Sequence, residues 1–85
     1  MGIHLTSFQG SIETAIRDSI VKAIPDAKVE VTGGGGHWNI AVTSTVFDGK
    51  RPVEKQRLVL QSIAHLMAGD QAPVHAVDSL KTLTP

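Results

Sequence analysis

The chain has 85 residues, with eight lysines and arginines, eight aspartates and glutamates, and no cysteine. This length suits one domain, the zero net charge removes the general attraction to DNA that basic domains have, and the lack of cysteine excludes disulfides and thiolate ligands from this chain. No apolar run approaches the roughly 20 residues that span a bilayer, so we expect a soluble cytoplasmic protein that does not bind membranes.

The N-terminal part predicts a flexible arm over residues 1–9, followed by a single domain over residues 10–85. A helix is expected to start at Ser11, whose hydroxyl can cap the free N–H groups of the first turn. It is expected to stop at Ile24, because Pro25 disfavours helical geometry for the residue before it. The apolar residues that share one side of this helix at a period near 3.6 are Phe8, Ile12, Ala15, Ile16, Ile20 and Ala23.

Two runs of alternating apolar and polar residues follow, Lys28–Thr32 and Trp38–Thr43, with the four glycines Gly33–Gly36 and His37 between them. Alternation with period two predicts strands, and a short glycine loop between two strands predicts a hairpin. Glycine suits the turn because it adopts positive φ without a steric penalty. The residues expected to face the core are Val29, Val31, Trp38, Ile40 and Val42.

The second half of the chain predicts helix and then strand. Pro52 suits the first turn of a helix. Leu58 falls on the polar face of that helix, which favours two short helices broken near Gln56 over one helix with an exposed leucine. Pro73 cannot donate to a strand ladder, so the last strand is expected to begin at about Val74.

These elements predict an α+β fold in the order α-β-β-α-α-β, with helices on one face of a small three-stranded mixed sheet. The last connection passes from strand through helix to strand, so the third strand should run parallel to the second with a right-handed crossover. His37 immediately precedes the second strand and His75 starts the third. Neighbouring strands are about 4.8 Å apart, so the two histidines are expected at one sheet edge, roughly 5–10 Å apart, where both can face one metal centre.

Spacing alone leaves the role of these histidines open. Packing or hydrogen bonding at a strand end is the commoner role, and two imidazoles are too few for a closed zinc site. An iron–sulfur cluster would need thiolates from a partner, because the chain has no cysteine.

Two other motifs give less specific indications of function. The run Gly33–Gly36 matches the G-x-x-G pattern of nucleic-acid-binding KH loops, but it lies between strands and contains no basic residue. Lys55 and Arg57 belong to a local basic cluster, which is either a solvated helix face or a docking patch for an acidic partner.

Taken together, several segments resemble the BolA family, and within it the acid-stress branch of bacterial BolA-like proteins. The resemblance covers about residues 11–85. The segments that carry it are His37-Trp38, Val46-Phe47-Asp48-Gly49-Lys50, Lys55-Gln56-Arg57-Leu58-Val59, Val74-His75-Ala76-Val77 and Lys81-Thr82-Leu83-Thr84-Pro85.

The resemblance implies a fold similar to type II KH domains and a non-enzymatic adaptor in iron–sulfur trafficking or iron sensing. It implies a monothiol CGFS-type glutaredoxin as partner and a shared [2Fe-2S] cluster, with thiolates from the glutaredoxin cysteine and from glutathione. His75 then matches the cluster ligand of the H-A motif, and His37 is the nearest match to the second ligand. Lys55 and Arg57 become candidates for the docking surface. The isolated chain is expected to bind no cluster and to be a monomer or weak homodimer.

Some members of the family are described as DNA-binding transcriptional regulators, which gives the alternative function. The neutral charge of this chain argues against strong nonspecific DNA affinity and leaves room for weak DNA binding.

Overall fold

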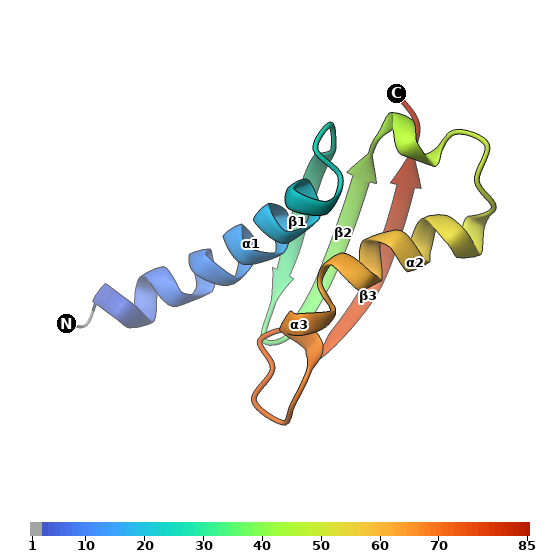
Figure 1. Ribbon diagram of the computed structural model, residues 1–85. Coiled ribbons are helices and arrows are strands. Elements are labelled where there is room, and N and C mark those ends of the chain that lie inside the picture. The colour runs from blue at the N-terminus through green and yellow to red at the C-terminus, as the bar shows by residue number, and fades with distance from the viewer. Residues whose placement is uncertain (1–2) are drawn as a thin grey trace.

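The computed structural model describes residues 3–85, and the surroundings of their side chains from Ile12 onward (Figure 1). It confirms the predicted α-β-β-α-α-β order, with one additional short 3-10 helix, η1. The elements are α1 (Ile3–Ala23), β1 (Lys28–Gly34), β2 (His37–Thr43), η1 (Thr45–Phe47), α2 (Pro52–Ser62), α3 (Ala64–Met67) and β3 (Ala76–Leu83).

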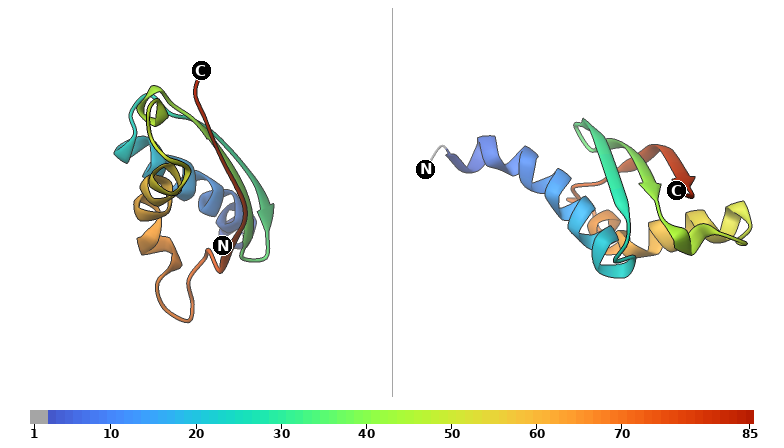
Figure 2. Two further views of the ribbon diagram at one scale, coloured as in Figure 1. Left: turned by 90° about the vertical axis from the view of Figure 1, so that its right-hand side faces the viewer. Right: turned by 90° about the horizontal axis from the view of Figure 1, so that it is seen from above.

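The three strands form one mixed sheet in the order β1-β2-β3. β1 and β2 pair antiparallel through the hairpin, and β2 and β3 pair parallel, as the crossover predicted. The helices of residues 3–85 all lie on one face of this sheet (Figure 2).

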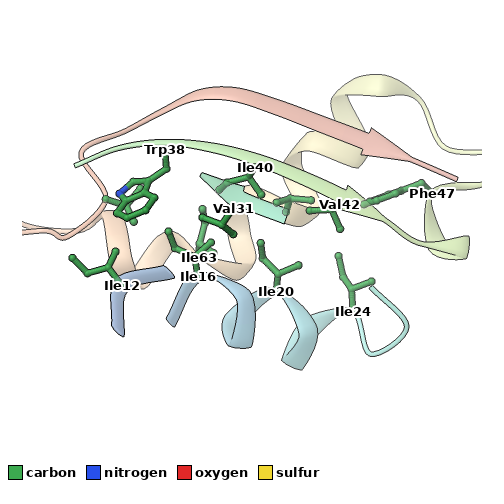
Figure 3. Packing of buried hydrophobic residues seen from close by; sticks show 12 residues of the cluster. Ile12, Ile16, Ile20, Ile24, Val31, Trp38, Ile40, Val42, Phe47 and Ile63 are labelled. Carbon is green, nitrogen blue, oxygen red and sulfur yellow. The ribbon is translucent and has the colours of Figure 1, made fainter. Parts of the chain in front are cut away.

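The core lies between the sheet and the helices that cover it, with α1 packed opposite the middle strand β2 (Figure 3). Trp38, Ile40 and Val42 alternate along β2 and are at most 2% exposed, because successive side chains of a strand point to opposite faces. Ile16 and Ile20 of α1 are fully buried opposite them, at the four-residue spacing that puts side chains on one side of a helix.

The helix α1 begins at Ile3, well before the predicted start at Ser11. Residues 3–11 contain no proline, and the one glycine, Gly10, weakens a helix by about 1 kcal/mol without ending it. Met1 and Gly2 lie outside the described residues, and the flexibility of residues 1–9 stays a prediction. Although α1 has 21 residues, neither it nor any other helix of residues 3–85 combines the length and apolar character needed to cross a membrane.

The predicted helix break near Gln56 is wrong, because α2 continues through this residue to Ser62. Leu58 is half-buried and packs against the core, so its position on the polar face needs no break. The chain breaks instead at Ile63, which has φ −113° and ψ 9° and whose N–H donates to the carbonyl of Leu60 at 3.3 Å. The side chain of Ile63 is fully buried, so the break lies at a core position.

The strand β3 starts at Ala76 and not at Val74. The N–H of Val74 donates to the carbonyl of Leu66 in α3 at 3.1 Å, and the Val74 side chain is fully buried. Val74 therefore ties the connection to the helical layer before the chain enters the sheet.

Candidate functional site

The hairpin turn consists of two glycines. Gly34 pairs with His37, so only Gly35 and Gly36 lie between the strands. Their φ angles are +62° and +86°, and two successive positive φ values are typical of the type I′ turn that suits the twist of a hairpin. The turn makes His37 the first residue of β2.

The connection that enters β3 meets this turn. The N–H groups of His75 and Ala76 both donate to the carbonyl of Gly36, at 2.8 Å and 3.0 Å. Ala76 is also the partner of His37 in the parallel register. The structure therefore brings the backbones of the two histidines together at one end of the β2–β3 pair, which we call the histidine end.

Gly36 also makes room for the imidazole of His75. A Cβ added at Gly36 would collide with Cδ2 and approach Cγ of the His75 ring. Gly35, in the same turn, has open space where its Cβ would be. The His75 ring therefore lies directly against the backbone of Gly36, and a side chain at position 36 would force the ring to move.

His37 is held by a different contact. Its Nδ1 lies 3.1 Å from Oδ1 of Asp78, and the two side chains are 61% and 51% exposed. Asp78 sits in a register shift of β3, because Trp38 pairs with Val77 whereas the next residue, Asn39, pairs with Ser79. Asp78 is thus the extra residue of a β-bulge, a feature that is rare in parallel pairs and redirects side chains near functional sites.

The donor chemistry of the histidine end suits part of a metal centre. Each neutral imidazole offers one lone pair, and a [2Fe-2S] cluster needs four protein or thiol ligands. Among the side chains that the structure describes, from Ile12 onward, no group of three or more histidine, cysteine, aspartate or glutamate residues is placed to hold an ion. His37 and His75 could therefore supply at most two of these four ligands.

The opposite end of the β2–β3 pair carries a polar cluster around Asp26. Its carboxylate accepts hydrogen bonds from the Ser44 hydroxyl at 2.6 Å, the Thr45 N–H at 3.0 Å and the Thr45 hydroxyl at 2.8 Å. These bonds stabilise the ionised form and lower the pKa of Asp26 to about 2, with the Ser44 bond as the largest cause. Ser44 is fully buried and also accepts from the N–H of Val46, so this cluster fixes the corner after β2.

The predicted docking residues lie elsewhere. Lys55 is half-buried and Arg57 is exposed, and both belong to the first turns of α2. Figure 1 shows this part of α2 far from the hairpin turn. Arg57 lines a shallow, mainly apolar hollow on α2 together with Val53 and Leu60. Lys55 and Arg57 therefore lie apart from the histidine end.

The bulge at Asp78 was not predicted from the sequence. Val77 and Leu80 both pack against the core, and a spacing of three does not agree with the period of two that a regular strand requires. Two successive polar residues between two inward-facing apolar ones were the available signal. The contact between Gly36 and His75 had no such signal, because it depends on the crossover.

Comparison with known proteins gives consistent matches. The family described as "BolA-like protein" matches residues 6–85. Mouse BolA-like protein 1 is 30% identical over 86 residues, which cover 89% of this chain and only 60% of the mouse protein. The acid stress protein IbaG of Escherichia coli K12 is 31% identical over 70 residues, covering 82% of this chain and 80% of that protein.

Solved structures agree. The solution structure of mouse BolA1 has a TM-score of 0.69 at 32% identity, covering 87% of this chain and 65% of the mouse chain. The BolA domain of SufE1 from Arabidopsis thaliana has a TM-score of 0.70 at 25% identity, covering 85% and 89% of the two chains. The order of helices and strands, the parallel β2–β3 pair and these matches lead to one conclusion: the chain belongs to the BolA-like family.

Proposed function

We propose that this protein is a non-enzymatic adaptor that shares a [2Fe-2S] cluster with a monothiol CGFS-type glutaredoxin, in iron–sulfur trafficking or iron sensing. The observation that supports it best is the histidine end. The parallel pairing of β2 with β3 brings two exposed imidazole-bearing residues, His37 and His75, to the same end of the sheet on neighbouring segments of the chain. A chain without cysteine can contribute to such a cluster only through donors of this kind.

In this proposal the two histidines have unequal roles. His75 is the primary ligand, and its ring is positioned against Gly36. His37 is the second ligand on the neighbouring strand. The partner's cysteine and glutathione supply the thiolates. When bound, the cluster supplies a transferable, redox-active iron centre, and a neutral imidazole in place of a thiolate lowers its negative charge.

The test mixes the purified chain with a cluster-loaded monothiol glutaredoxin and records visible absorption and circular dichroism. The wild type is expected to change both spectra, and His75→Ala is expected to abolish the change. His65→Ala is the matched control, because His65 lies on α3 with its Nε2 3.2 Å from the Ser19 hydroxyl, in the helical layer. No spectral change with the wild type, or an unaltered change with His75→Ala, would refute cluster sharing.

A nucleic-acid-binding regulator is the alternative. The observation in its favour is the basic run that precedes and enters α2, comprising Lys50, Arg51, Lys55 and Arg57. It predicts binding to duplex DNA that weakens steeply with salt and needs no cluster. A titration from low to physiological salt distinguishes it, since no binding even at low salt excludes this alternative.

A further inference from the structure

The bulge residue Asp78 has no partner in the β2–β3 register. In an unbroken parallel ladder, the residue after Val77 would lie opposite Asn39; the bulge gives that place to Ser79 instead. Asp78 is thereby released from the ladder, and its carboxylate contacts the ring of His37, the first residue of β2. A device that is uncommon in parallel sheets thus serves a contact at the histidine end.

This contact determines which ring nitrogen of His37 carries the proton. An ionised carboxylate can only accept hydrogen bonds, so at 3.1 Å the Nδ1 of His37 must be the donor. In the neutral imidazole, the lone pair then resides on Nε2, at the far side of the ring from Asp78. A carboxylate that accepts a hydrogen bond from a metal-binding histidine, and so fixes its tautomer and ring orientation, is a recurring arrangement in metalloproteins.

We propose that Asp78 is a positioning residue for His37: it holds the Nδ1–H tautomer and directs Nε2 away from the protein as the ligand atom. The ligand part of this inference rests on the proposed function. The two histidines are then oriented by two different devices. His75 is positioned by contact with Gly36, and His37 is positioned by a hydrogen bond from β3. More than half of each side chain of the His37–Asp78 pair is exposed, so the pair adds little to stability and its effect is on orientation.

The first measurement uses the isolated chain. Nitrogen-15 NMR of the histidine rings at neutral pH distinguishes the two tautomers of His37 without any metal. The wild type is expected to show predominantly the Nδ1–H form, and Asp78→Ala is expected to shift His37 toward the Nε2–H form. Asp70→Ala is the matched control, because Asp70 is an exposed aspartate in the connection between α3 and β3. An Asp78→Ala spectrum in which the His37 tautomer is unchanged overturns the proposal.

The second measurement adds the cluster-loaded glutaredoxin. Asp78→Ala is expected to weaken the shared-cluster complex about tenfold, the lower end of the loss of metal affinity seen when the hydrogen-bond partner of a ligand is removed. The complex formed by His37→Ala is expected to be at least as weak. Combining Asp78→Ala with His37→Ala should weaken the complex no further, because both substitutions remove the same oriented ligand. A complex of unchanged strength with Asp78→Ala overturns the proposal.

Together, the two measurements distinguish a failure of the proposed function from a failure of the proposed role of Asp78. If the wild-type chain forms no shared cluster, the proposed function is refuted, and the tautomer measurement alone decides whether Asp78 positions His37. If the wild type forms the cluster but either measurement fails to respond to Asp78→Ala, the function stands and the role of Asp78 is refuted.

Discussion

The two ends of the β2–β3 pair are built from the same strands but in opposite ways. At the Asp26 end, a carboxylate accepts three hydrogen bonds, and the hydroxyl of Ser44 is completely buried. At the histidine end, His37 and His75 are exposed. The difference is in burial and in the number of bonds: the Asp26 carboxylate is exposed but is held by three hydrogen bonds, one of them from the buried Ser44, whereas each histidine side chain is exposed and His37 has a single contact, with Asp78.

The largest effect is expected from a substitution at the histidine end that leaves both histidines in place. Gly36→Ala should abolish or severely weaken cluster sharing, because the added Cβ collides with the His75 ring. Gly35→Ala should leave sharing intact, because its Cβ meets open space. Both positions have positive φ, so both variants are expected to lose about 1–2 kcal/mol of unfolding free energy. Visible circular dichroism with glutaredoxin and urea unfolding measure the two effects.

This glycine pair separates strain from contact. If Gly35→Ala impairs cluster sharing as much as Gly36→Ala, backbone strain in the turn is the cause and the contact with His75 is irrelevant. Full sharing with Gly36→Ala would show that the position of the His75 ring does not matter.

A smaller effect is expected from the opposite end. Ser44→Ala should lower the unfolding free energy by about 1–2 kcal/mol, because it removes a donor to Asp26 and leaves the N–H of Val46 without its acceptor. For a domain of this size, each kcal/mol lowers Tm by about 4–8 °C. Far-ultraviolet circular dichroism measures the melting, with Ser79→Ala on β3 as the control. Cluster sharing should be unchanged at temperatures where Ser44→Ala is folded, and a loss of sharing there would contradict the separation of the two ends.

The smallest effect is a dependence on acid. The folded-state pKa of Asp26 is lowered from 3.8 to about 2. A lowered pKa contributes stability that is complete above the unfolded value and is lost as the pH falls through the folded one. Stability should therefore decline from about pH 4 toward pH 2, and Asp26→Asn should flatten this part of the profile. Urea midpoints measured across this range test it, and an equally steep decline in Asp26→Asn would assign the acid sensitivity to other carboxylates.

Local sequence patterns correctly predicted those elements whose bounds depend on nearby residues. The glycine run between alternating strands gave the hairpin, and Pro52 gave the start of α2. The break at Ile63 was missed because neither glycine nor proline marks it; the residue is fully buried, so packing with the core accompanies the break.

The candidate site, like the fold, was predictable only in part. The strand–helix–strand crossover was sufficient to place His37 and His75 at one end of the sheet. The contacts that orient their rings were not, because Gly36 meets His75 and Asp78 meets His37 only after segments distant in the chain have paired. Their roles as ligands stay predictions.

Trp38, the only tryptophan of the chain, follows His37 in β2 and lies fully buried on the other face of the strand. Its indole N–H donates to the carbonyl of Pro73 at 3.3 Å, in the connection that leads to His75. One fluorophore is thus joined to both segments that carry the candidate ligands. A coloured iron centre at this end of the sheet would quench its emission by energy transfer, so the protein contains its own optical reporter of loading and of cluster release.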